Sequence, residues 1–154
     1  MVTVIGFRHI AVVVRDLENM IRFYTQILGF EVKRHFNIKS EDFRKGVAIA
    51  EAEAKGAHLI VPNSSVEIEL FQFETPMPNL SNIPLQANRL GYRHMALVVG
   101  NLEETYLELK KNGIEFLSEP ITVKEPKEVA GFQFVYFRDP EGNIIELNQL
   151  PEWA

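Results

Sequence analysis

The sequence predicts an α+β fold made of two copies of one module. Gly6 to Val14 reads GFRHIAVVV, and Gly91 to Val99, 85 positions later, reads GYRHMALVV. Both runs are rich in β-branched and apolar residues, which is typical of strands. Each run leads into a polar N-cap and an amphipathic helix, and strand-like segments follow. Both halves therefore share the order strand, helix and three strands, which indicates an internal repeat.

Size, charge and cysteine content exclude several classes of protein. A chain of 154 residues is enough for one domain or for two small modules that share a core. No apolar run approaches the about 18 residues of a membrane span, and no secretory signal pattern is visible. We therefore expect a cytoplasmic protein without a membrane partner. The net charge of -5 argues against nucleic-acid binding. The absence of cysteine excludes disulfides and thiolate ligands.

The first half contains the module and an insert. A strand is predicted from Phe7 to Val14, followed by a helix that Asp16 caps and Gly29 ends. The Ala- and Glu-rich segment Ser40 to Gly56 is predicted to be an inserted helix, capped by Ser40 and stopped by Gly56. The remaining strands expected here are 30–36, 57–61 and 66–73.

The second half repeats this order without the inserted helix. Asn101 is expected to cap a helix that ends at Gly113. The segment Ser118 to Gly131, which contains two prolines, is predicted to be a long loop and a candidate lid. The strands expected in this half are 92–99, 114–117, 132–137 and 144–148.

These elements predict a single domain of two modules. The N-terminal module covers residues 1–75, with its helical insert at 40–56. A linker rich in proline and asparagine covers residues 76–90. The C-terminal module covers residues 91–154.

Two histidines and two glutamates occupy matching positions in the repeat. His9 and His94 lie in the first strand of each module, and Glu69 and Glu146 lie in the last strand, in IELFQ and IELNQ. A lone strand histidine is more often structural, but a carboxylate inside an apolar strand is costly unless it is paired or bound to metal. Four such residues in matching positions predict a shared site for one divalent metal. Imidazole and carboxylate ligands favour Ni, Zn, Co, Mn or Fe.

The chain resembles the vicinal oxygen chelate superfamily in four segments that cover nearly its whole length: RHIAVVVRDLENMIRFYTQILGFEV, IELFQFETP, GYRHMALVVGNLEETYLELKKNGIEF and YFRDPEGNIIELNQ. This superfamily includes glyoxalase I, methylmalonyl-CoA epimerase, extradiol dioxygenases, and fosfomycin- and bleomycin-resistance proteins. The resemblance implies paired βαβββ modules that form a half-open, U-shaped barrel around one divalent metal. It implies His9, Glu69, His94 and Glu146 as the metal ligands, and a homodimer.

The ligand set distinguishes branches of the superfamily. A full His-Glu-His-Glu set is most similar to bacterial glyoxalase I, whereas the epimerases have Gln where Glu69 stands. Extradiol dioxygenases and fosfomycin thiol transferases use two histidines and one carboxylate, and bleomycin-binding members have lost the ligands. No glutathione-binding set is identifiable in this sequence.

We therefore expect a metal-dependent, glyoxalase-like lyase or isomerase that acts on a small carbonyl compound through an enolate or enediolate. Glu146 or Glu69 is expected to be the base, with Glu146 preferred. Two alternatives in the same scaffold are an epimerase and an Fe(II) ring-cleaving dioxygenase, in which Glu69 is not a ligand. A third is a non-catalytic binding or resistance protein. The substrate, the native metal, and a site within one chain or across a swapped dimer stay open.

Residues around these four carry weaker expectations. His35 and His58 do not fit the repeat, so core or surface roles are expected, with His58 a candidate pocket residue. Glu67 shares the face of Glu69, and we expect it at an exposed strand end rather than as an acid that supports a metal ligand. Arg8 is expected to face away from the site, toward helix acids.

Overall fold

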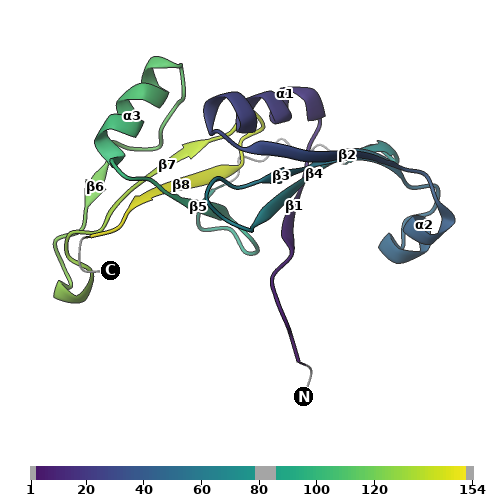
Figure 1. Cartoon of the computed structure of the whole chain (residues 1–154), viewed down its shortest axis with the longest axis horizontal. Coiled ribbons are helices and arrows are strands. Elements are labelled where there is room, and N and C mark those ends of the chain that lie inside the picture. Colours follow the sequence, from purple (N-terminus) through teal and green to yellow (C-terminus); the bar gives the residue numbers. More distant parts are fainter. Residues whose placement is uncertain (1–2, 79–85, 152–154) are drawn as a thin grey trace. The chain divides into compact units, whose positions relative to one another are not determined.

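The computed structural model describes residues 3–78 and 86–151. The chain divides into two compact units, Met1–Ser81 and Asn82–Ala154. Residues 79–85 of the expected linker lie outside the described residues. Each unit carries its own four-stranded sheet, with the helices drawn in Figure 1.

The first unit is built around a sheet with the strand order β1-β4-β3-β2. Strand β1 runs parallel to β4, and the other neighbouring pairs are antiparallel. The elements of this unit are β1 (His9–Val13), α1 (Leu17–Arg22), the π-helical turn η1 (Phe23–Ile27), β2 (Glu31–Ile38), α2 (Glu41–Val47), β3 (Glu53–Ile60) and β4 (Glu67–Thr75).

The second unit repeats this topology with the strand order β5-β8-β7-β6. Its first and last strands, β5 and β8, again run parallel. Its elements are β5 (His94–Val98), α3 (Leu102–Lys111), β6 (Ile121–Thr122), the 3₁₀ turn η2 (Lys127–Val129), β7 (Gln133–Arg138) and β8 (Ile144–Gln149). The predicted α+β fold of paired βαβββ modules is therefore confirmed.

The helix starts explain how each helix is attached to its sheet. Asp16 and Asn101 cap α1 and α3 as predicted, each accepting a backbone N–H bond at 3.0 Å. A glutamine in each last strand supplies a second acceptor. Gln72 Oε1 lies 3.0 Å from the first amide nitrogen of α1, and Gln149 Oε1 lies 2.7 Å from that of α3. Two of the unpaired N–H groups at each helix start are thus satisfied, one of them by the sheet.

One face of each sheet packs on its helix, and this face forms most of the core. In β4, Ile68 and Leu70 are fully buried there, while Glu69 and Phe71 lie on the opposite face. The buried apolar residues are Val14, Leu17, Met20, Ile21, Phe23, Tyr24, Phe30, Ala52, Ala54, Ala57, Leu59, Ile68 and Leu70 in the first unit, and Leu102, Tyr106, Leu109, Val135, Phe137, Ile144, Ile145 and Leu147 in the second. Across residues 3–78 and 86–151, no helix has the length and apolar character needed to cross a membrane.

The inserted helix is shorter than predicted. Ser40 caps α2 as expected, but the helix ends at Val47, and Ala48 adopts a left-handed conformation with φ 55°. The expected continuation to Gly56 is wrong, because residues 53–56 belong to β3. Alanine and glutamate favour helix, but pairing on both sides of β3 overrides that preference. The alternation of buried Ala52 and Ala54 with half-buried Glu53 has the period of a strand.

The strand expected at 114–117 is also wrong. Only Phe116 pairs, in an isolated bridge with Phe137. The edge strand is instead β6, which lies inside the segment 118–131 predicted to be a loop. Ile121 and Thr122 pair with β7 there, and both are β-branched. The candidate lid is thus partly a strand of the sheet.

Gly56 marks a close approach of three strands, which gives a stability prediction. A Cβ at Gly56 would overlap the Leu70 carbonyl oxygen and the Phe36 ring. Gly56→Ala is therefore expected to lower the free energy of unfolding by about 1–3 kcal/mol. Gly46→Ala is the matched control, because Gly46 is helical and has open space around it. That change is expected to raise stability by about 0.5–1 kcal/mol. Urea unfolding of both variants checks this, and a neutral Gly56→Ala would contradict it.

Candidate metal centre

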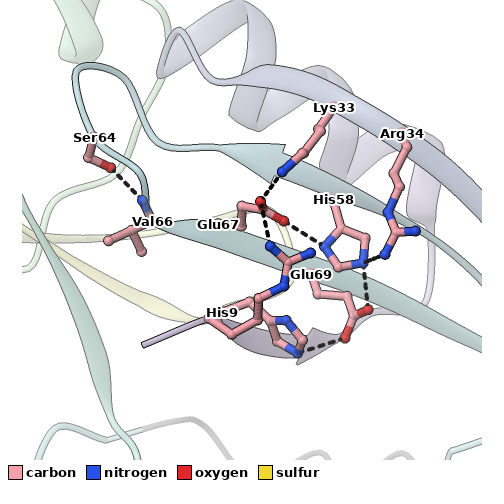
Figure 2. A network of polar contacts seen from close by, with 9 residues as sticks. His9, Lys33, Arg34, His58, Ser64, Val66, Glu67 and Glu69 are labelled. Carbon is pink, nitrogen blue, oxygen red and sulfur yellow. Dashed lines mark hydrogen bonds and ion pairs between the residues drawn. The ribbon is translucent and has the colours of Figure 1, made fainter. Parts of the chain in front are cut away.

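The first histidine–glutamate pair lies on two adjacent parallel strands. His9 is the first residue of β1, and Glu69 lies in β4, where its register partner is Ala11. The two side chains lie on the same face of the sheet, and His9 Nε2 is 3.3 Å from Glu69 Oε2. This is the face opposite the helix. Figure 2 shows the two side chains pointing toward one another, joined by a dashed line.

The second pair is built by the same rule in the other unit. His94 is the first residue of β5, and Glu146 lies in β8 with Ala96 as its register partner. His94 Nε2 is 3.0 Å from Glu146 Oε2. In both units the histidine therefore lies two residues before the alanine that faces the glutamate. The repeat seen in the sequence thus extends to the pairing of individual side chains.

The chemistry of each pair fits two ligands of one cation. Ligand bonds of about 2.1 Å that meet at angles from about 90° to 109° place two donor atoms about 3.0–3.4 Å apart. The separations of 3.3 Å and 3.0 Å lie in that range. The glutamate side chains are 12% and 10% exposed, and the histidines 32% and 40% exposed, so each pair is open on the histidine side.

The four predicted ligands appear as these two pairs, one in each unit. Within residues 3–78 and 86–151, no group of three or more His, Asp or Glu side chains is arranged to hold a metal ion. His9 Nδ1 is buried and has no hydrogen-bond partner among the described atoms.

A third residue, His58, contacts Glu69 from the other side. His58 lies in β3 and is the register partner of Glu69 across the antiparallel pairing. Its Nε2 lies 2.8 Å from Glu69 Oε1, and its Nδ1 lies 3.0 Å from Glu67 Oε2. His58 and Glu67 are only 2% and 3% exposed. Figure 2 shows His58 between the two carboxylates.

Two cationic side chains contact the carboxylate of Glu67, and these contacts correct our expectations for Glu67 and for Arg8. Arg8 donates to Glu67 Oε1 at 3.1 Å, and Lys33 donates to the same oxygen. The hydrogen bond from Lys33, together with the positive charges of Arg8 and Lys33, holds the pKa of Glu67 below its ordinary value despite burial. Glu67 is therefore not an exposed strand end. Arg8 reaches Glu67 rather than helix acids because it precedes the first residue of β1, where strict strand alternation does not apply.

His58 Nε2 also faces a positive charge. An Arg34 Nη2 lies 3.0 Å from this nitrogen, on the side away from Glu67. A guanidinium can only donate, so it needs a lone pair on Nε2, whereas the Glu69 carboxylate needs a proton there. In any one protonation state, His58 Nε2 can therefore form a hydrogen bond with Arg34 or with Glu69, but not with both.

In the second unit, neutral groups contact the equivalent carboxylate. Tyr136 is the register partner of Glu146, so it occupies the place that His58 has in the first unit. Burial, the negative charge of Glu146 and a hydrogen bond to it raise the pKa of Tyr136 above its ordinary value. The phenol is thus held as a donor. With its amide oriented to donate, Asn148 lies 2.8 Å from Glu146 Oε1.

Sequence reasoning did not recognise His58 and Tyr136 as equivalent. His58 precedes Glu69 by 11 residues, whereas Tyr136 precedes Glu146 by 10. The connection 61–66 between β3 and β4 is one residue longer than the connection 139–143 between β7 and β8. When the two halves are aligned on Glu69 and Glu146, His58 therefore falls one position away from Tyr136. The signal that could have found it is an aligned repeat with a one-residue gap in this turn.

Comparison with protein families gives a match over most of the chain. The model of the Glyoxalase/Bleomycin resistance protein/Dioxygenase superfamily matches residues 6–147. The chain is 35% identical to protein YwkD of Bacillus subtilis, with 92% of this chain and 94% of the relative covered. It is 28% identical to a 2-epi-5-epi-valiolone epimerase of Actinomyces sp (97% and 82% covered), and 29% identical to human mitochondrial methylmalonyl-CoA epimerase (92% and 72% covered).

Solved structures share the fold. A glyoxalase family protein from Bacillus cereus has a TM-score of 0.82 at 24% identity, with 96% of this chain and 95% of that chain covered. The fosfomycin resistance protein FosX from Listeria monocytogenes, solved with Mn(II) and sulfate, has a TM-score of 0.59 at 17% identity, with 98% and 97% covered. At these identities the likeness concerns the fold.

The lowered pKa of Glu67 predicts a pH-dependent contribution to stability. A carboxyl whose pKa is depressed in the folded chain stabilises it above the ordinary value of 4.5, and the contribution is lost as the pH falls through the folded value. Glu67→Gln is therefore expected to lower the urea midpoint at about pH 7, and the difference from the unsubstituted chain should shrink by about pH 3.

Glu31→Gln is the matched control for this measurement, because Glu31 is an exposed acid at the start of β2. Its urea midpoint should differ little from that of the unsubstituted chain at either pH. A Glu67→Gln difference that stays constant across this pH range would contradict the assignment.

Proposed function

The chain belongs to the Glyoxalase/Bleomycin resistance protein/Dioxygenase superfamily, and on that premise we propose that it is a metal-dependent isomerase or epimerase. It would move a proton at a carbon next to a substrate carbonyl. The observation that carries this proposal is the pair of His–Glu contacts built at the same register in both modules. Two relatives named as epimerases support epimerisation, whereas Glu69, which stands where the superfamily's epimerases have Gln, supports isomerisation of the glyoxalase type.

We propose all four residues as ligands of the cation, as the sequence repeat and the resemblance predict. His9 and Glu69 supply one imidazole nitrogen and one carboxylate oxygen, and His94 and Glu146 supply the same set. A bound divalent cation would act as a Lewis acid toward the carbonyl oxygen and stabilise the negative charge that develops when the neighbouring C–H loses its proton. Zn, Ni, Co, Mn and Fe all suit this mixed donor set.

Glu146 is the residue that we propose takes the proton, and Glu69 is the alternative. As the C–H bond breaks, its electron pair enters the enolate and the proton passes to a Glu146 oxygen. Tyr136 and Asn148 donate to this carboxylate and orient it. The Glu146 carboxylic acid then returns the proton, either to the neighbouring carbon, which isomerises the substrate, or to the same carbon after the enolate has turned its opposite face toward Glu146, which inverts that carbon.

An apolar surface lies beside the first pair on the same face of the sheet. Phe36 packs on Phe71 with ring centroids 4.9 Å apart, and on His58 at 5.5 Å. Phe43 of α2 and Phe73 extend this cluster, at 6.1 Å and 5.9 Å from Phe71. Apolar walls around a few polar groups are typical of sites for small organic molecules. This supports a small carbonyl compound as the substrate.

Metal content is the first test of the proposal. The purified chain is expected to carry about one Ni, Co, Zn or Mn ion, measured by inductively coupled plasma mass spectrometry. His9→Ala and His94→Ala should each lose it, because each removes a ligand. His35→Ala, an exposed histidine of β2, is the matched control and should retain it.

The outcomes of this measurement separate the alternatives. Two ions per chain would contradict a shared centre. Bound iron would favour a ring-cleaving dioxygenase, and no ion after reconstitution would overturn the proposal in favour of a binding protein.

The proton transfer has its own test with three probe compounds. They are methylmalonyl-CoA, 2-epi-5-epi-valiolone, and the hemithioacetal of methylglyoxal and glutathione. Conversion of one of them in D₂O should incorporate solvent deuterium at the carbon next to the carbonyl, detected by NMR. Glu146→Gln is expected to slow this exchange by about 10²–10⁴-fold without loss of the fold. Exchange at an unchanged rate in that variant would exclude Glu146 as the base.

A further inference from the structure

The proposed function leaves His58 and Glu67 without a role, although both are almost completely buried. A buried imidazole and a buried carboxylate are costly unless their polar atoms are paired. His58 Nδ1 is hydrogen-bonded to Glu67, and His58 Nε2 lies 2.8 Å from Glu69 Oε1 and 3.0 Å from Arg34 Nη2. The chain of contacts therefore ends on a proposed metal ligand (Figure 2).

The two oxygens of Glu69 have different partners. Oε1 lies 2.8 Å from His58 Nε2, while Oε2 lies 3.3 Å from His9 Nε2. A carboxylate with one oxygen held against a buried imidazole offers the other oxygen to a cation. Glu69 is thus arranged to bind through one oxygen. Single-oxygen binding keeps other coordination positions open for a substrate.

The orientation of His58 is itself fixed by a charged anchor. Glu67 Oε2 accepts from His58 Nδ1, and Glu67 Oε1 accepts from Arg8 and Lys33. These partners come from β2, β3, β4 and the residue that precedes β1. A rotation of the His58 ring would leave the buried Glu67 oxygen without a donor, which is costly.

The second unit lacks this anchor. Tyr136 occupies the place of His58, but Ile144 stands where Glu67 stands, since Glu67 faces His9 and Ile144 faces His94 in the strand register. Glu146 therefore has a phenol and an amide as neighbours, whereas Glu69 contacts an imidazole that a buried carboxylate and its two cationic partners hold in place. Glu69 and Glu146 thus occupy equivalent positions, but different side chains contact them.

We propose that His58, anchored by Glu67, is a positioning residue that holds Glu69 as a single-oxygen metal ligand and so leaves Glu146 as the carboxylate that moves a proton. This inference rests on the proposed metal centre. It assigns unequal roles to two residues that the repeat makes equivalent. Residues that orient metal ligands typically change metal affinity or activity by about 10–100-fold when they are replaced.

Two substitutions of His58 distinguish the contact of Nε2 with Glu69 from the contact of Nδ1 with Glu67. The amide of His58→Gln extends to the position of Nε2 and can still donate to Glu69. The amide of His58→Asn extends only to the position of Nδ1 and can reach Glu67 alone. Mn(II) is the probe, and its affinity is measured from the electron paramagnetic resonance signal of the free ion. The expected result is near-native affinity for His58→Gln and a loss of about 10–100-fold for His58→Asn.

Two further variants complete the design. His35→Asn makes the same change at an exposed histidine of β2 and is expected to bind Mn(II) like the unsubstituted chain. Glu67→Gln removes the anchor but keeps the shape of the side chain, so an intermediate loss of affinity is expected. Visible absorption of the Co(II)-loaded variants should change with His58→Asn and stay native-like with His58→Gln, as expected for an altered set of ligand atoms.

The outcomes separate this inference from the proposed function. Absence of Mn(II) binding to the unsubstituted chain would overturn the metal centre itself. Binding to the unsubstituted chain together with native affinity of His58→Asn, or equal losses in His58→Asn and His58→Gln, would overturn the positioning role alone. If His58→Asn does not fold, Glu67→Gln decides the question, and native Mn(II) affinity in that variant would overturn the proposal.

Discussion

The parallel pairing of the first and last strands of each module is the constraint on which the rest of the structure depends. It places a residue at the start of β1 or β5 diagonally beside a residue of β4 or β8, on the face that the helix does not cover. A histidine and a glutamate at these positions must then meet. The site is therefore a consequence of topology and register, and it needs no special loop. Because the module is repeated, the contact is repeated.

Repetition of the backbone does not extend to the neighbours of the two glutamates. Glu69 is contacted by an imidazole that a buried carboxylate holds, and Glu146 by a phenol and an amide. A partner that is itself held by several contacts restricts a side chain more than partners with fewer contacts do. A duplicated scaffold can thus supply two matching carboxylates and assign them separate tasks through residues on the next strand.

Much of this was predictable from the sequence, and the failures have identifiable physical causes. The repeat and both helix caps follow from strand alternation and capping chemistry, which are local, whereas the contact of each histidine with the glutamate of its own module depends on the parallel register of distant strands. The extent of the inserted helix was not predictable, because residues 53–56 have helical propensity and become a strand only through partners far away in sequence. The role of Glu67 was hidden for the same reason, since its burial depends on Arg8 and Lys33.

The glutamines that end IELFQ and IELNQ give the last strand of each module, β4 or β8, a second structural function. Glu69 and Glu146 face the site, and three residues later Gln72 and Gln149 face the helix and accept its first N–H. A slip of one residue in β4 or β8 would exchange the two faces. Such a slip would turn the carboxylate into the core and remove the helix attachment at the same time. The same short motif therefore disfavours misaligned pairings of the strand for two independent reasons, the buried carboxylate and the lost helix attachment. Attachment of the helix and formation of the His–Glu contact consequently depend on the same strand register.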